Sequence, residues 1–192
     1  MWASRLQRTP VPERVPGSDL IYSLSRALAA EGRSIYLLGG EPGTAEAAAQ
    51  VLGNLNPGLR IAGTCCPPLG FEQQPEELRS IRSRLVAAKP DLVFVALGSP
   101  KQENWIVRNR FACGARLSIG VGVSFSFYCG DIVRAPLWMQ KAGLEWLHRM
   151  VQEPRRLARR YLIDDRLFLS LFARAWVARL MGRPVGAFQP RQ

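Results

Sequence analysis

The chain has 192 residues, about the length of one domain with an appendage, and 47% of them are hydrophobic, which is enough for a buried core. Its 26 basic and 15 acidic residues give a formal net charge of +11. This charge suits an anionic partner or, equally well, reflects a high-GC genome that favours arginine codons. No uncharged run approaches the roughly 20 residues of a membrane span, and residues 1–17 contain no apolar stretch of a secretory signal.

Helices and strands alternate along residues 18–123. We predict helices at 18–30, 44–52, 75–88 and 101–109, strands at 34–38, 59–63, 91–97 and 117–123, and an irregular segment at 65–74. The strands are continuously apolar, which is typical of parallel strands buried on both faces. The alternation predicts an α/β fold, a Rossmann-like open and mostly parallel sheet flanked by helices.

Two loops follow predicted strands, at the edge of the sheet where such folds bind ligands. In the first loop, Gly39 and Gly40 precede the start of a helix. Backbone N–H groups there can cradle a phosphate. The GxGxxG and GK[ST] patterns are absent, however, so a tight turn explains these glycines as well.

The second loop, after the predicted strand at 91–97, contains more residues that can bind a ligand. Gly98 lets the backbone approach a ligand, and Pro100 fixes the turn. Lys101, Gln102 and Glu103 then stand at the start of a helix, where one of them can point into the site. The Gln102 amide can donate to and accept from a sugar hydroxyl or a nucleobase edge. A capped helix with exposed polar residues is the alternative interpretation.

The chain is strongly basic after residue 147. Residues 148–192 contain 10 arginines and 3 acids. Apolar residues at helical spacing accompany them: Leu169, Phe172, Trp176 and Leu180. The combination fits the surface of an anionic bilayer or a helix packed on its own core. We predict a domain at 1–147 and a basic helical C-terminal appendage at 148–192.

Arginines recur through the last third of the chain. Arg149, Arg156 and Arg160 are spaced seven and four residues apart, so they can share one helical face. Such a face can bind a diphosphate, or it can be a solvated charged surface.

The cysteines and the histidine indicate no metal or triad chemistry. The four cysteines form no CxxC pair and have no histidine near them in the sequence, so we expect free thiols and no zinc. The single histidine, His148, lies among arginines, which argues against a Ser-His-Asp triad. We find no role for the neighbours Cys65 and Cys66.

Two long segments resemble the signatures of the WecG/TagA/CpsF glycosyltransferases. They are DLVFVALGSPKQENWI at 91–106 and RAPLWMQKAGLEWLHRMVQEPRRLARRY at 134–161. ERVPGSDL at 13–20 and IYLLGG at 35–40 resemble earlier segments of the same family. The resemblance runs in order from about residue 2 to residue 161.

The resemblance implies an enzyme that transfers a sugar from a UDP donor to a polyprenyl-diphosphate-linked sugar. The implied donors are UDP-N-acetylmannosamine, its uronic acid and UDP-glucose, and the products enter teichoic-acid linkage units, enterobacterial common antigen or exopolysaccharide. The implied reaction is inverting and needs neither metal nor cofactor. The implied location is the cytoplasmic face of the membrane, which the basic appendage would meet, and an oligomer is allowed.

The resemblance also implies roles for single residues. Arg14 and Gln102 match active-site positions. Arg149, Arg156 and Arg159 match arginines that would face a diphosphate, and Arg134 matches a structural or site-lining arginine.

This chain departs from the family pattern at three places. The presumed general base, an aspartate in an Asp-Gly motif, would fall shortly before Met1. The family's GVGG.FD segment has Val123 in place of a glycine and Ser126 in place of an acid, and Cys65 and Cys66 are unusual.

Three hypotheses remain open from the sequence. The first is the glycosyltransferase, with a native N-terminus further upstream. The second is a degenerate paralogue that binds UDP-sugar or membrane without turnover. The third, a nucleic-acid-binding module, is supported only by charge, since no helix-turn-helix, RRM or KH pattern is present. We expect no nucleic-acid partner.

Overall fold

The computed structural model describes residues 15–130, 133–154, 170–171, 173–177 and 181. They belong to two compact units. The first is Val15–Val133, and the second includes Arg134 and the residues after it. We describe each unit by itself. The domain boundary after residue 147 stays a prediction.

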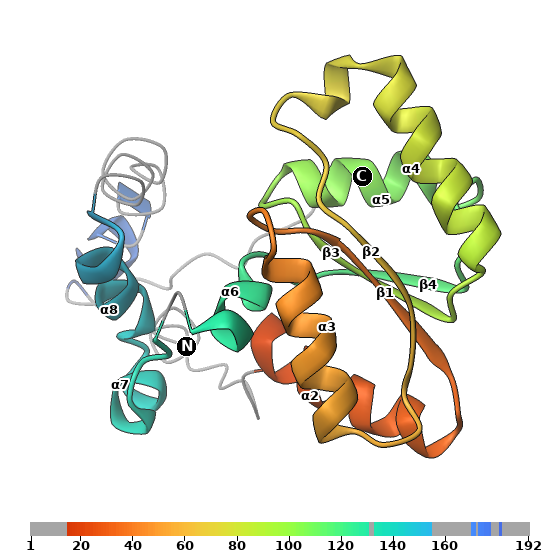
Figure 1. Cartoon of the computed structure of the whole chain (residues 1–192). Coiled ribbons are helices and arrows are strands. Elements are labelled where there is room, and N and C mark those ends of the chain that lie inside the picture. The colour runs from red at the N-terminus through yellow and green to blue at the C-terminus, as the bar shows by residue number, and fades with distance from the viewer. Residues whose placement is uncertain (1–14, 131–132, 155–169, 172, 178–180, 182–192) are drawn as a thin grey trace. The chain divides into compact units, whose positions relative to one another are not determined.

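The first unit is built on a parallel sheet of four strands (Figure 1). The strands are β1 (Ser34–Gly39), β2 (Arg60–Cys65), β3 (Leu92–Ala96) and β4 (Leu117–Gly120). Their spatial order is β2-β1-β3-β4. The strand β2 therefore lies on one side of β1, and β3 and β4 follow on the other side. This topology confirms the predicted α/β fold and places the reversal of strand order between β1 and β3.

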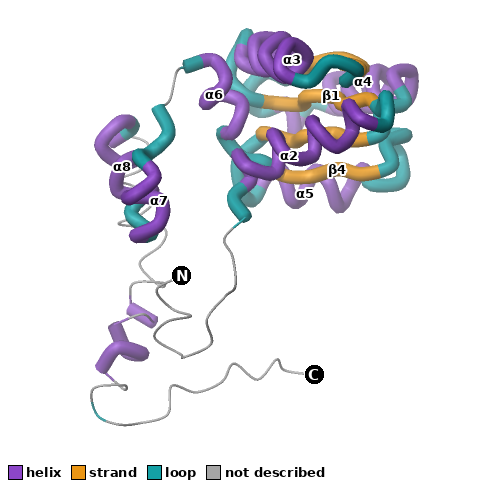
Figure 2. The backbone as a smooth tube through the Cα atoms, turned by 90° about the horizontal axis from the view of Figure 1, so that it is seen from below, coloured by secondary structure: helices purple, strands orange, loops and turns teal. Residues whose placement is uncertain are grey.

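Helices cover both faces of the sheet (Figure 2). The strand β1 shows the division, because Ile35 and Leu37 point into one core while Tyr36 and Leu38 point into the other. The first core is closed by α2 (Gly17–Ala30), α3 (Thr44–Leu55) and α6 (Ser124–Cys129). The second core is closed by α4 (Pro75–Ala88), α5 (Lys101–Asn109) and the short 3₁₀ helix η1 (Phe71–Gln73).

Burial separates the central strands from the edge strands. Every residue of β1 and β3 is buried, as the continuous apolar runs predicted. The edge strands β2 and β4 are only partly buried, and Leu117 at the start of β4 is 52% exposed. The prediction of burial on both faces is therefore right for the centre of the sheet and wrong for its edges.

Three local predictions need correction. The strand expected at 117–123 ends at Gly120, because Gly122 adopts a φ of 61° and turns the chain into the unpredicted helix α6. The hydroxyl of Ser124 donates to the carbonyl of Val121 across this turn. The segment 65–74, expected to be irregular, contains η1, and the helix expected to end at residue 52 continues to Leu55.

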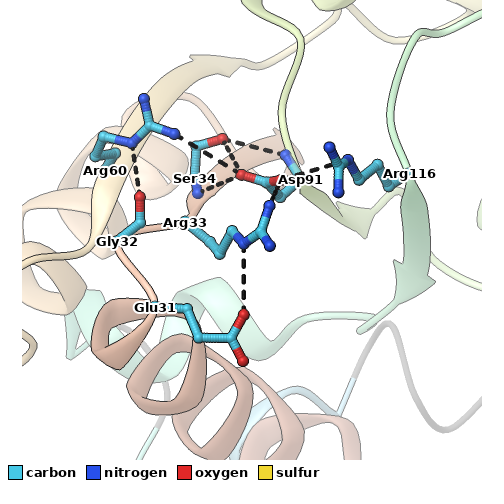
Figure 3. Close-up of polar contacts among 7 residues, drawn as sticks. All are labelled: Glu31, Gly32, Arg33, Ser34, Arg60, Asp91 and Arg116. Carbon is cyan, nitrogen blue, oxygen red and sulfur yellow. Dashed lines mark hydrogen bonds and ion pairs between the residues drawn. The ribbon is translucent and has the colours of Figure 1, made fainter.

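Asp91 joins the amino-terminal ends of β1 and β3 (Figure 3). Its Oδ2 accepts hydrogen bonds from the backbone N–H and the hydroxyl of Ser34, both at 2.9 Å. Guanidinium groups of three strand-end arginines surround the same carboxylate: Arg33 at 3.3 Å, Arg116 at 3.6 Å and Arg60 at 4.0 Å. The hydrogen bonds from Ser34 and, after them, the nearby arginine charges hold the pKa of Asp91 below its ordinary value.

We expect Asp91→Asn to lower the unfolding free energy at neutral pH. A lowered pKa in the folded state means that the ionised carboxylate stabilises the fold above the ordinary aspartate pKa, and that this stabilisation is lost as the pH falls through the folded value. Urea denaturation should therefore separate the two proteins at about pH 7 and bring them together at about pH 2–3. Glu31→Gln, which removes an exposed partner of Arg33, is the control and should change little. A difference that persists in acid would contradict the assignment.

The second unit contains the short helices α7 (Leu137–Ala142) and α8 (Glu145–Gln152), and its described residues 170–171 and 173–177 are also helical. Gly143 adopts a φ of 75° between them, and the N–H of Leu144 closes the end of α7 by donating to the carbonyl of Met139 at 2.8 Å. Of the predicted apolar stripe, Trp176 is described and is 53% exposed. Leu169, Phe172 and Leu180 lie outside the described residues. Within the described part of the chain, no helix is long and apolar enough to span a bilayer.

Candidate functional site

The candidate site lies at the carboxyl edge of the sheet, where the strand order reverses between β1 and β3. Open α/β sheets bind their ligands at this position. The loop after β1 and the loop after β3 meet there, since the N–H of Gly40 donates to the carbonyl of Ala96 at 2.9 Å. The reversal is a property of the topology alone, so it identifies this edge without reference to any motif.

The loop after β1 depends on its two glycines. A Cβ at Gly39 would lie 2.6 Å from the carbonyl oxygen of Ala96, and one at Gly40 would collide with the hydroxyl of Thr44 and lie 3.2 Å from the Phe125 ring. Both glycines also adopt positive φ values, 100° and 87°. The glycines thus bring the loop against β3 and α6 before α3 begins at Thr44, as a tight turn or a phosphate-binding loop requires.

The loop after β3 delivers the chain into α5. It contains a cis peptide bond between Ser99 and Pro100, and the backbone N–H of Gln102 donates to the carbonyl of Gly98 at 2.9 Å. Gly98 has a φ of 76° with open space where its Cβ would stand. Pro100 and Glu103 are exposed, whereas Gln102 is buried.

Gln102 joins two loops of the edge. Its Oε1 accepts the backbone N–H of Gly122 in the loop after β4 at 2.9 Å, and its Nε2 donates to Glu103 Oε1 at 2.9 Å. The side chain lies against Gly120, where a Cβ would come within 2.8 Å of Nε2. A primary amide carries two N–H groups, and within the described residues one of them is occupied by Glu103. The other suits a ligand oxygen.

Sequence reasoning missed an ion pair at this edge. Lys101 Nζ lies 2.5 Å from Glu72 Oε1, and this joins the start of α5 to η1. The hydrogen bond from Lys101 is the main reason that the pKa of Glu72 lies below its ordinary value. The position of Lys101 beside Gln102 was the available signal, but its partner lies in a segment without periodicity.

The two neighbouring cysteines divide between the core and the site. Cys65 is buried in the core beneath α4, while the thiol of Cys66 donates to the carbonyl of Gly40 at 3.2 Å. Burial raises the pKa of both thiols, so both are protonated at neutral pH. Cys66 therefore acts as a hydrogen-bond donor that supports the loop after β1.

Helix starts add partial positive charge at the same edge. Both α3 and α5 begin directly after the loops that meet at the reversal of strand order. The dipoles of these helices favour an anion such as a phosphate at their amino-terminal ends. The arrangement can bind a phosphate group through backbone N–H groups and a polar sugar or base through Gln102.

The family departures at 123 and 126 fit the fold without strain. Val123 has a φ of −85°, which any residue adopts, so the fold requires no glycine there. Ser126 is buried in α6, and its N–H donates to the carbonyl of Val123 at 3.0 Å. Among the described side chains, no group of three His, Cys, Asp or Glu residues stands close enough together to hold a metal ion.

The structure brings six predicted site residues to one edge: Gly39, Gly40, Gly98, Pro100, Gln102 and Glu103. Arg134 and Arg149 belong to the second unit, where Arg149 lies 3.6 Å from Glu153 in an ion pair along α8. The four remaining predicted residues, Arg14, Arg156, Arg159 and Arg160, lie outside the described residues.

Comparison with known proteins agrees with the resemblance read from the motifs. Residues 1–182 match the model of the glycosyl transferase WecG/TagA/CpsF family. A relative in Bacillus subtilis (strain 168), N-acetylglucosaminyldiphosphoundecaprenol N-acetyl-beta-D-mannosaminyltransferase, is 31% identical over 156 residues. The alignment covers 81% of this chain and 59% of the relative, so the chain spans less than two thirds of that protein's length.

Proposed function

The chain belongs to the WecG/TagA/CpsF family of glycosyl transferases, and from that premise we propose that it serves in the transfer of a sugar from a UDP donor to a polyprenyl-diphosphate-linked sugar. The name of the Bacillus relative supports an undecaprenyl-diphosphate-linked N-acetylglucosamine as the acceptor and N-acetylmannosamine as the transferred sugar. The product would enter a bacterial cell-surface polymer.

The observation that carries this proposal is the placement of Gln102. Its amide lies at the carboxyl edge of the sheet, between the loops after β3 and β4 and beside the start of α5. A nucleotide-sugar offers the matching groups, a diphosphate for the helix start and hydroxyl and carbonyl oxygens for the amide.

The proposed chemistry is an inverting displacement without a metal. A general base takes the proton of the acceptor hydroxyl, the resulting oxygen attacks the anomeric carbon of the donor, and UDP leaves with the electrons of the broken bond. Negative charge then grows on the leaving diphosphate. Backbone N–H groups and cations at the carboxyl edge stabilise that charge more in the transition state than in the bound substrate.

The second unit has a proposed part in acceptor binding. Arg149 and the arginines after it carry the charge that a lipid-linked diphosphate needs, and exposed apolar side chains accompany them, including Leu137, Trp138 and Val151 at 72%, 64% and 75% exposed. Such a surface suits the boundary of an anionic bilayer. We therefore place the protein at the cytoplasmic face of the membrane, as a peripheral protein.

A transfer assay with the protein isolated from its own cells tests the proposal, and the intact mass of the same sample reports its full length. The donors are UDP-N-acetylmannosamine, the corresponding uronic acid and UDP-glucose, and the acceptor is N-acetylglucosamine on a short prenyl diphosphate. We expect one donor to yield a disaccharide lipid, seen as a mass increase of one sugar. Failure of every donor to react, with UDP still bound, would favour the non-catalytic binding protein instead.

A further inference from the structure

The ion pair between Lys101 and Glu72 joins two segments that follow different strands. Glu72 lies in η1, within the connection from β2 to α4, and Lys101 is the first residue of α5 after the loop from β3. Their charged atoms lie 2.5 Å apart, although both side chains contact solvent, with exposures of 30% and 54%. The pair therefore holds the η1 segment against the start of α5.

Each partner is poorly placed apart from the other. Glu72 Oε2 is buried and has no hydrogen-bond partner among the described residues. A buried carboxylate oxygen without a partner destabilises the folded protein. Lys101 places a positive charge at the amino-terminal end of a helix, where the dipole disfavours cations. An anion beside Lys101 relieves the second cost, and Glu72 supplies that anion.

We propose that Lys101 is a diphosphate-binding residue that Glu72 holds in place, and that an arriving diphosphate displaces the Glu72 carboxylate from the ammonium group. The inference rests on the proposed function and gives a role to Lys101, to which the sequence assigned none. Lys101 is adjacent to Gln102, so the same turn of α5 would present an amide to the sugar or base and a cation to the diphosphate. Release of Glu72 then removes this link between η1 and α5, while Phe71 of η1 stays buried in the core.

The lysine is suited to such an exchange. Its ammonium group has three donors on a flexible stem, so it can leave one anion for another without a fixed planar geometry. A diphosphate offers more charge and more acceptor oxygens than one carboxylate. Glu72 thus competes with the ligand and lowers its apparent affinity, while it keeps the lysine positioned.

Titration calorimetry on the full chain tests the exchange with two probes, UDP for the nucleotide diphosphate and geranyl diphosphate for the lipid diphosphate. We expect Lys101→Met to weaken binding of at least one probe about tenfold or more, as loss of a charge-assisted hydrogen bond does. We expect Glu72→Gln to tighten the same probe by about threefold, because the amide competes less for the ammonium group. The probe that responds identifies the source of the diphosphate.

A gain of affinity separates this role from a structural one, because a damaged site does not bind more tightly. Lys89→Asn is the matched control, since it removes a lysine charge at the opposite end of the same unit, at a φ of 46° that asparagine tolerates. Its affinity should equal that of the wild type. Unchanged binding of both probes by Lys101→Met, or weaker binding by Glu72→Gln, overturns the inference while the donor assignment stands. Failure of the wild type to bind either probe overturns the inference together with the proposed substrates.

Discussion

Replacing Gly39 by alanine is expected to destabilise the Val15–Val133 unit by about 3–5 kcal/mol, the largest effect of any single methyl group that we predict. Two costs add at this position. The new Cβ would stand 2.6 Å from the carbonyl oxygen and 2.7 Å from the carbonyl carbon of Ala96, both backbone atoms of a buried strand. The φ of 100° is strained for any residue with a Cβ.

Relief of this clash would disturb the site as well as the fold. Gly39 and Ala96 are register partners at the carboxyl ends of β1 and β3, and the next residue donates its N–H to the same carbonyl. A shift of either strand therefore separates the two loops that meet at the reversal of strand order. We expect the Gly39→Ala variant to lose UDP affinity at temperatures where it is still folded.

Urea denaturation of Gly39→Ala and Gly32→Ala separates the two costs. Gly32 also has a positive φ, 61°, but nothing lies within 4 Å of its hypothetical Cβ. Its variant should lose only the backbone part, about 1–2 kcal/mol. Equal losses of unfolding free energy in the two variants would show that the backbone relaxes to accommodate the new Cβ beside Ala96. The loop would then not need a glycine for its close approach to Ala96.

The fold was predictable where local pattern and tertiary environment agree. The strand β1 is apolar from Ile35 to Leu38 and β3 is apolar at every position, and both lie in the centre of the sheet, so composition alone marks them. The residues Gly120 to Val123 are as apolar as a strand, but β4 is a short edge strand whose last pairing, the N–H of Val121 to the carbonyl of Val95, is followed at once by a turn. A pattern of apolar and glycine residues does not distinguish a strand that continues from a turn that leads into a helix. The sequence therefore did not predict α6.

The site was predictable to the extent that it follows from backbone geometry. Gly39, Gly40 and Gly98 each need a conformation or a closeness that only glycine supplies readily, so a glycine after a strand is informative. The ion-pair partner of Lys101 could not be predicted in this way. Glu72 is brought to Lys101 by the tertiary fold, from a segment whose sequence shows no helical or strand periodicity. Pairings of this type become visible only when the strands are placed.

The largest functional effect is expected at Gln102. Conversion to glutamate keeps an oxygen that can accept the N–H of Gly122, but it removes both amide donors and places a second carboxylate beside Glu103. The oxygens of the sugar or base would then face a carboxylate in place of the amide donors, and the lost hydrogen bonds together with this repulsion are worth roughly a hundredfold in kcat/KM. We therefore expect Gln102→Glu to lower sugar transfer about a hundredfold, with a much smaller change in thermal stability.

A second variant, Gly120→Ala, displaces the Gln102 side chain without changing its amide group. Gly120 has an ordinary backbone conformation, and a Cβ there would lie 2.8 Å from Nε2 and 2.9 Å from Cδ of Gln102. The obstructed atoms are the end of a flexible side chain, so Gly120→Ala should fold normally and push the amide away from the N–H of Gly122. We expect transfer to fall in this variant too, while the melting temperature stays close to that of the wild type.

The two variants together decide what the amide does. If Gln102 contacts the donor, both changes lower kcat/KM for transfer and weaken UDP-sugar binding. Gln102→Glu then has the larger effect in both measurements. If the amide only ties the loop after β4 to α5, Gln102→Glu retains that tie through its oxygen and stays near wild-type activity, whereas Gly120→Ala does not. A Gln102→Glu variant that transfers sugar at the wild-type rate would therefore remove Gln102 from the binding site and leave it as a support of the loop.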